Sequence, residues 1–133
     1  MAKVDTLPEY LKPNMRGTSV RAPYCVVCGR TSPLNQHHVI RRGAGKLWRN
    51  GVEVKKPTLT LCGSGNTSGC HGLAHSQRLH FRWVETHPKA YGSYGTLTSG
   101  GHWEYVITEP MRELDAQRLA DGWRPIRTGA EDF

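Results

Sequence analysis

The stretch from Cys25 to His75 decides the fold, because it holds all four cysteines of the chain and four of its seven histidines. In order, it reads Cys25-x2-Cys28, then His37-His38, then Cys62-x7-Cys70-His71-x3-His75. Two cysteine pairs separated by a long segment match the four thiolate ligands of a structural zinc ion. We therefore predict one zinc ion bound by all four cysteines, which ties a knuckle to a distant turn. A redox-active Cys-x2-Cys pair is the main alternative.

Length and composition predict a single domain with a modest core. The chain has 133 residues, a hydrophobic fraction of 37%, 15 glycines and 8 prolines, so much of it is turn and loop. No run approaches the roughly 18 apolar residues that span a bilayer, and residues 1–12 lack the apolar region of a secretory signal. We predict a cytoplasmic protein without a membrane segment, in which cysteines bind metal rather than form disulfides.

The net charge of +7 is unevenly distributed. Residues 1–102 contain 14 Lys and Arg against 4 Asp and Glu, whereas residues 103–133 contain 4 against 7. A basic segment around the cysteines and histidines indicates a polyanionic partner, with nucleic acid the leading candidate. We predict phosphate contacts from Arg41, Arg42, Lys46 and Arg49. The alternative is an ordinary solvated basic surface.

Local patterns predict short strands and two helices. The predicted strands are 36–40, the two arms of a hairpin over 47–54 with an Asn50-Gly51 turn, 58–61, and 102–108. A glycine-rich loop is expected over 92–101. One helix is predicted from Cys70 to Trp83 or Val84, with Ser68 as its cap, and a second from Glu109 to Leu119.

The four histidines of this stretch are expected to form a second site. Adjacent side chains on a strand point to opposite faces, so His37 and His38 should have different roles. On a helix, His71 and His75 would lie on one face, about 5–6 Å apart, where two imidazoles can bind one ion. The alternative is that the histidines lie on the surface or bind zinc adventitiously.

Three motifs resemble the His-Asn-His (HNH) endonuclease family, and its small phage-encoded members in particular. They are Gln36-His37-His38, Leu59-Thr60-Leu61-Cys62-Gly63-Ser64-Gly65 and Gly69-Cys70-His71-Gly72. The resemblance implies an α+β fold with a ββα-metal (His-Me finger) core, a four-cysteine zinc knuckle, and a C-terminal strand and helix. It also implies one catalytic divalent ion, which could be Mg²⁺, Mn²⁺, Ni²⁺ or Zn²⁺. By position, His38 would be the general base, and the ligands would be His37, His71 and His75.

The family's central asparagine has no direct counterpart. It usually precedes the Leu-x-Leu-Cys of the second strand, which places Thr58 at or next to that position. A threonine hydroxyl could orient the base with one group where the asparagine uses two. Asn66, in the following loop, is the other candidate for this role, although it is offset by eight residues.

The chemistry of the residues agrees with phosphodiester hydrolysis. The reaction needs a base, a cation and basic residues that hold the flanking phosphates, and this stretch supplies candidates for all three. We predict a metal-dependent DNA endonuclease with little intrinsic sequence specificity. The alternative is a noncatalytic, zinc-stabilised nucleic-acid-binding protein on the same scaffold. The resemblance further implies a bacterial or phage-infected cytoplasm, and a phage packaging protein such as terminase as a partner.

Three segments are expected along the chain. Residues 1–23, interrupted by prolines, are predicted to be a flexible basic arm. Residues 24–87 form the zinc-stabilised nuclease core. Residues 88–133 form a strand-helix extension packed on that core.

Overall fold

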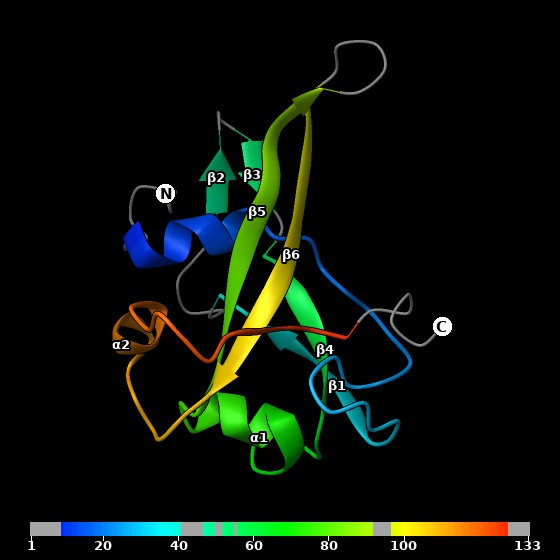
Figure 1. Ribbon diagram of the computed structural model, residues 1–133. Helices are drawn as coiled ribbons and strands as arrows, with labels where there is room; N and C mark the ends of the chain where they lie inside the picture. The colour runs from blue at the N-terminus through cyan, green and yellow to red at the C-terminus, as the bar shows by residue number, and fades with distance from the viewer. Residues whose placement is uncertain (1–8, 41–46, 50–51, 55, 92–96, 128–133) are drawn as a thin grey trace.

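A computed structural model describes residues 9–40, 47–49, 52–54, 56–91 and 97–127 of the chain (Figure 1). Its helices are η2 (Glu9–Arg16, a 3-10 helix), α1 (Gly69–His75) and α2 (Glu113–Gln117). Its strands are β1 (Leu34–His38), β2 (Leu47–Arg49), β3 (Val52–Val54), β4 (Thr58–Cys62), β5 (Leu79–Tyr91), β6 (Leu97–Ile107) and β7 (Arg124–Pro125). The pairs β1–β4 and β2–β3 and the sheet β5–β6–β7 are all antiparallel. The α+β class is confirmed.

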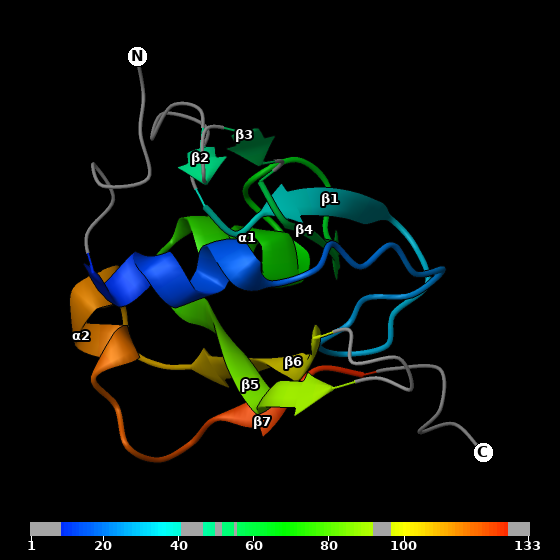
Figure 2. The same ribbon diagram turned by 90° about the horizontal axis from the view of Figure 1, so that it is seen from above.

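The β1–β4 pair lies next to α1, beside the long hairpin (Figures 1 and 2). Its register places His37 opposite Leu59 and His38 opposite Thr58. Leu59 and Leu61 lie on the same face of β4 and are fully buried, and Thr60 and Cys62 on the other face are each 2% exposed, so both faces of this strand are covered. The strand predicted over 58–61 is confirmed as β4. The strand predicted over 36–40 is present as β1, which begins and ends two residues earlier. The predicted hairpin over 47–54 is also confirmed, with its two turn residues outside the described part.

The first helix is much shorter than predicted. It ends at His75, Gln77 adopts a left-handed backbone with φ of 64°, and β5 begins at Leu79. Leu79 and Phe81 are each 3% exposed, and this two-residue spacing buries them on one face of a strand. The prediction of a helix reaching Trp83 or Val84 is therefore wrong, because the tertiary core favours the two-residue period.

The β5–β6 hairpin is the longest element and projects from the body of the molecule (Figure 1). The predicted strand 102–108 is present but starts earlier, at Leu97, so residues 97–101 of the predicted loop are strand. Gly101 permits this because a Cβ there would lie 2.5 Å from the Trp83 ring and 2.7 Å from the Val84 carbonyl oxygen. The strand β5 continues across the predicted boundary after residue 87.

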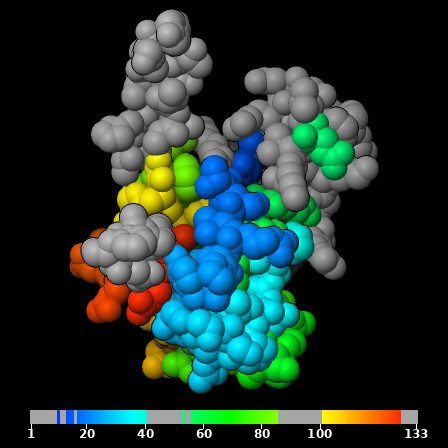
Figure 3. All heavy atoms as spheres, turned by 90° about the vertical axis from the view of Figure 1, so that its right-hand side faces the viewer, coloured from blue at the N-terminus to red at the C-terminus, as the bar shows by residue number. Residues whose placement is uncertain are grey.

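One hydrophobic core joins the predicted nuclease core to the predicted extension. Cys25, Val26, Leu59 and Leu61 pack in the same cluster as Phe81, Trp103 and Ile126. In Figure 3 the chain before and around the knuckle, coloured blue to cyan, lies between the orange-to-red C-terminal residues and the green residues that follow it in the sequence. The C-terminal residues therefore belong to the core itself.

The described part of the N-terminal segment is packed against this core. The Asn14 side chain, 1% exposed, donates to the Phe81 carbonyl oxygen at 3.1 Å and accepts from the Trp83 amide at 3.0 Å. It thereby pairs with the edge of β5 as a strand would. The Val20 amide donates to the Thr58 carbonyl oxygen at 2.8 Å. The prediction of a flexible arm is wrong for these residues, and residues 1–8 lie outside the described part.

The second helix is also shorter than predicted, covering Glu113–Gln117. The residues before it bind the turn after α1: the Thr108 amide donates to the Arg78 carbonyl oxygen at 2.8 Å, and the Met111 amide to that of Gln77 at 3.0 Å. These long-range bonds replace the first turn of the predicted helix. Among the described residues, no helix is long and apolar enough to cross a membrane.

Candidate metal centres

The four cysteines come together from three elements. Cys25 and Cys28 lie on a tight turn, closed by the Gly29 amide donating to the Cys25 carbonyl oxygen at 2.9 Å. Gly29 has a φ of 82°, which a glycine adopts without strain. Cys62 ends β4 and Cys70 lies in the first turn of α1. The four sulfur atoms lie within 4.8 Å of one another, so the predicted cluster is present.

The geometry of the cluster fits a tetrahedral ion. None of the cysteines forms a disulfide, and the Cys28 and Cys62 sulfurs are 3.5 Å apart. Four sulfurs at about 2.3 Å from a zinc ion lie about 3.8 Å from one another. The Cys70 amide also points at the Cys62 sulfur, 3.4 Å away. The donor set is therefore compatible with structural zinc.

The pKa values of the thiols explain why the cluster would favour a bound cation. A hydrogen bond with Cys70 lowers the pKa of Cys25 to about 4, and the same bond raises the pKa of Cys70. Burial raises the pKa of Cys28. Four thiolates cannot share this small volume without a compensating charge, so we expect metal binding to release protons.

Three histidines form the second cluster. His37 comes from β1, while His71 and His75 come from successive turns of α1, and their ligand atoms lie within 4.8 Å of one another. The Nε2 atoms of His71 and His75 are 3.1 Å apart. His71 is buried and His75 is exposed, so the cluster opens to solvent on one side. The three imidazoles could therefore hold a metal ion that is open to solvent on one side.

The loop between β4 and α1 orients His71. Its ring Nδ1 donates to the Gly65 carbonyl oxygen at 2.8 Å, which leaves the Nε2 lone pair directed at the cluster. The Asn35 amide donates to the Gly63 carbonyl oxygen and so fixes the same loop to β1. Ser68 precedes α1 as predicted, but its hydroxyl accepts from the Ser64 amide at 2.8 Å instead of capping the helix.

Two supporting residues were missed by the sequence reasoning. Asn35 lies two residues before His37 and so shares its strand face, but an asparagine there does not itself indicate a loop contact. The Phe81 ring lies 6.1 Å from that of His37, measured between centroids. The predicted helix over residues 70–84 gives no reason to expect this contact, which depends on Phe81 lying in the strand β5.

The remaining predicted residues are placed differently. His38 and Thr58 are opposite one another across the β1–β4 pair, and the Thr58 hydroxyl accepts from the Gln36 side-chain amide at 3.2 Å. Asn66 lines a hollow together with His75. The side chains of Arg41, Arg42, Lys46 and Arg49 lie outside the described part.

The His37 imidazole should remain neutral well below neutral pH. Burial, reinforced by the nearby His71 and His75, lowers its pKa from the usual 6.5 to about 3. Between those values the unfolded chain binds a proton that the folded chain does not, so His37 should make the protein less stable as the pH falls. With zinc on the cysteines and no ion on the histidines, we expect the His37 ring signals in NMR to stay those of a neutral imidazole down to about pH 5.5.

The stability part of this prediction needs a matched variant. The difference in unfolding free energy between the wild type and His37→Gln should shift against the wild type as the pH is lowered from about 7 to about 5.5. A His37 ring that titrates near pH 6.5 would contradict the predicted burial effect.

Comparison with known proteins gave no match: no family model fits the chain, and neither the curated proteins nor the solved structures contain a significant relative.

Proposed function

We propose that this protein is a divalent-metal-dependent DNA endonuclease of the HNH type, in which β1, β4 and α1 form a ββα-metal core. The observation that supports this best is the convergence of His37, His71 and His75 from one strand and one helix, within 4.8 Å of one another. The adjacent His38 ends the same strand, opposite Thr58. A strand-strand-helix order with three histidine ligands and one neighbouring histidine is the arrangement that the sequence motifs imply.

In the proposed reaction, a ring nitrogen of His38 takes a proton from water. The water oxygen bonds to phosphorus, the bond from phosphorus to the leaving sugar oxygen breaks, and that oxygen takes a proton from solvent water. A neutral imidazole nitrogen has a lone pair that can accept this proton. A divalent ion bound by the three histidines would stabilise the negative charge that develops on the phosphate. The Gly65 carbonyl keeps the His71 Nε2 directed at that position.

Charge supports nucleic acid as the substrate. Between Tyr10 and Val84 the only acidic residue is Glu53. Arg30 and Arg127 are exposed near the turn that carries Cys25 and Cys28. The Arg127 side chain lies next to Gly29, because its Nε is 3.3 Å from the position that a Cβ on Gly29 would take. Guanidinium groups bind phosphate oxygens through paired hydrogen bonds, so this surface suits the backbone of a polynucleotide.

A noncatalytic nucleic-acid-binding module is the second candidate. The observation that favours it is Thr58, which lies at or next to the position of the family's asparagine and whose hydroxyl already accepts a hydrogen bond from Gln36. A base that is less well oriented would leave a site that binds metal and DNA but cleaves slowly.

A plasmid-nicking assay separates the two candidates. Zinc-loaded protein is tested with Mg²⁺, Mn²⁺, Ni²⁺ and Zn²⁺ in turn, and we expect nicking with at least one of them. A variant with both His71→Ala and His75→Ala should lose it, and excess metal should restore it in part if a single histidine is changed. DNA binding that weakens steeply with salt, without nicking under any of these ions, would instead support the binding module.

A further inference from the structure

A third polar cluster lies behind the three-histidine site, at the start of β5. His80 is buried, with a side chain 2% exposed, and both its ring nitrogens have partners. Its Nδ1 is 2.7 Å from a carboxylate oxygen of Glu113, and its Nε2 is 2.8 Å from the Gln77 carbonyl oxygen. The Gln77 carbonyl oxygen and the Glu113 carboxylate oxygen are both within hydrogen-bond distance of the ring. The imidazole therefore bridges α2 to the turn after α1.

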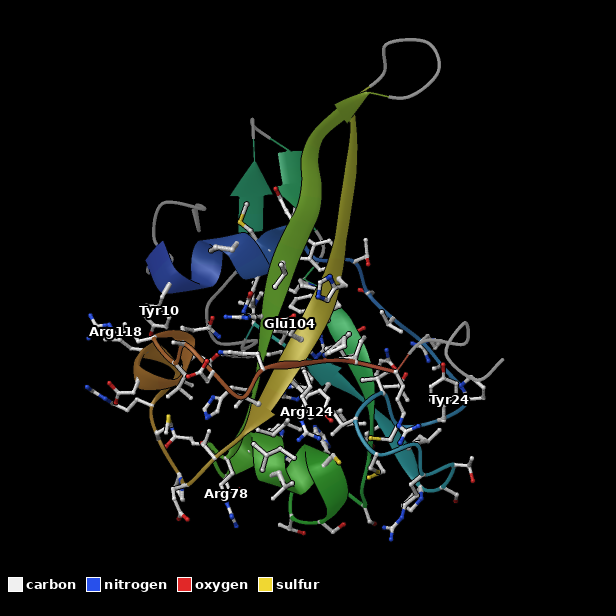
Figure 4. All side chains as sticks on the ribbon, viewed as in Figure 1. Tyr10, Tyr24, Arg78, Glu104, Arg118 and Arg124 are labelled. Carbon is white, nitrogen blue, oxygen red and sulfur yellow. The ribbon has the colours of Figure 1, made fainter. Side chains whose placement is uncertain are left out.

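The Gln77 end of this bridge lies close to His75, a proposed metal ligand. Gln77 follows His75 by two residues and holds the left-handed conformation that turns the chain from α1 into β5. Its carbonyl oxygen accepts from His80 and from the Met111 amide, at 2.8 and 3.0 Å. Figure 4 shows the neighbouring Arg78 at the foot of the hairpin, beside α1. A seven-residue helix has little stability of its own, so the bonds at its end help set where His75 lies.

The Glu113 end of the bridge is connected through β5 to His37, another proposed metal ligand. Gln117 donates to the other carboxylate oxygen of Glu113 at 2.7 Å and to the Phe81 carbonyl oxygen at 2.8 Å. The Phe81 ring in turn lies against that of His37. The Glu113 carboxylate thus supports the backbone of Gln77 through His80 and that of Phe81 through Gln117. Gln77 lies close to His75 in the sequence, and the Phe81 ring lies near His37.

We propose that Glu113 and His80 are a positioning pair for the three-histidine site. Through this pair, the helix α2 maintains the affinity of the three-histidine site for a divalent ion. This rests on the ion site of the proposed function. Neither residue touches the ion or the substrate. They act by holding Gln77 and Phe81, and hence His75 and His37, in the geometry of the bound state.

Nickel titration of the full chain, with zinc already on the cysteines, tests the pair. Glu113→Ala leaves the buried His80 Nδ1 without its acceptor, and we expect nickel affinity to fall by roughly 2- to 30-fold. Glu113→Gln should bind nearly as the wild type does, because its amide can donate to Nδ1 of a neutral imidazole whose Nε2 still donates to Gln77. Asp115→Ala is the matched control, since this α2 carboxylate pairs only with the exposed Arg112 among the described residues.

Three results would overturn the proposal: wild-type affinity in Glu113→Ala, an equal loss in Asp115→Ala, or an equal loss in Glu113→Gln. A wild-type protein that binds no ion at the histidines would contradict the proposed function instead. In that case hydrogen exchange decides about the pair. The amides of Arg78 and Met111 should lose protection in Glu113→Ala and keep it in Asp115→Ala, and unchanged protection in both would overturn it.

Discussion

His38→Ala should reduce plasmid nicking by roughly 10²-fold or more, because it removes the proposed general base. The fold, the zinc at the cysteines and the ion at the histidines should all remain, since His38 is not among the three histidines whose ligand atoms converge. Cleavage rate, metal content and melting temperature of the same preparation check these expectations together. A loss of rate with unchanged metal content would separate proton transfer from ion binding.

The matched control is His102→Ala. His102 is also a half-buried histidine on a strand, and its Nε2 lies 3.0 Å from Glu104, on the β5–β6 hairpin (Figure 4). This variant should cleave as the wild type does. Equal nicking by wild type and His38→Ala under every ion tested would show that His38 is not the base.

Cys62→Ser should abolish tight zinc binding and with it most of the stability of the fold. Cys62 is 2% exposed, lies in the core cluster, and receives the Cys70 amide on its sulfur. A serine hydroxyl is a poor zinc ligand, and structural zinc contributes about 10–16 kcal/mol of apparent binding free energy in zinc-finger peptides. We expect the variant to contain less zinc per chain than the wild type and to lose its cooperative thermal transition.

Ser64→Ala, two residues further along and exposed, is the control for this variant and should retain both zinc and the transition. Elemental analysis and thermal melting measure the two properties. A Cys62→Ser protein with one zinc ion and an unchanged melting temperature would show that the cysteines are dispensable.

The metal clusters could be predicted from sequence because ligand chemistry restricts the alternatives. Cys25, Cys28, Cys62 and Cys70 had to meet if they shared one ion. The alternating sequence around Leu59 and Leu61 indicated the strand β4. The roles of these residues in catalysis remain predictions. What the sequence showed is which side chains converge.

The errors concern segments whose structure depends on distant contacts. Residues 70–84 have apolar positions that suit a helix, yet burial of Leu79 and Phe81 on one face selects a strand after Gln77. Gly101 lies in a sequence typical of a loop, and only its close approach to Trp83 explains why it pairs in β6. The prolines near the N-terminus suggested a flexible arm, but nothing local shows that Asn14 binds the edge of β5.

Ile126 and Arg127 pack on the turn that carries Cys25 and Cys28. This packing affects the order in which the parts of the molecule can fold during synthesis. The Arg127 amide donates to the Val26 carbonyl oxygen at 2.7 Å, and Ile126 packs with Cys25 and Val26. A growing chain therefore presents all four cysteines to the cell well before the residues that seal the core over them. A metal ion bound at that stage would shorten the loop that the last residues must close, so zinc supply during translation is expected to govern the yield of folded protein.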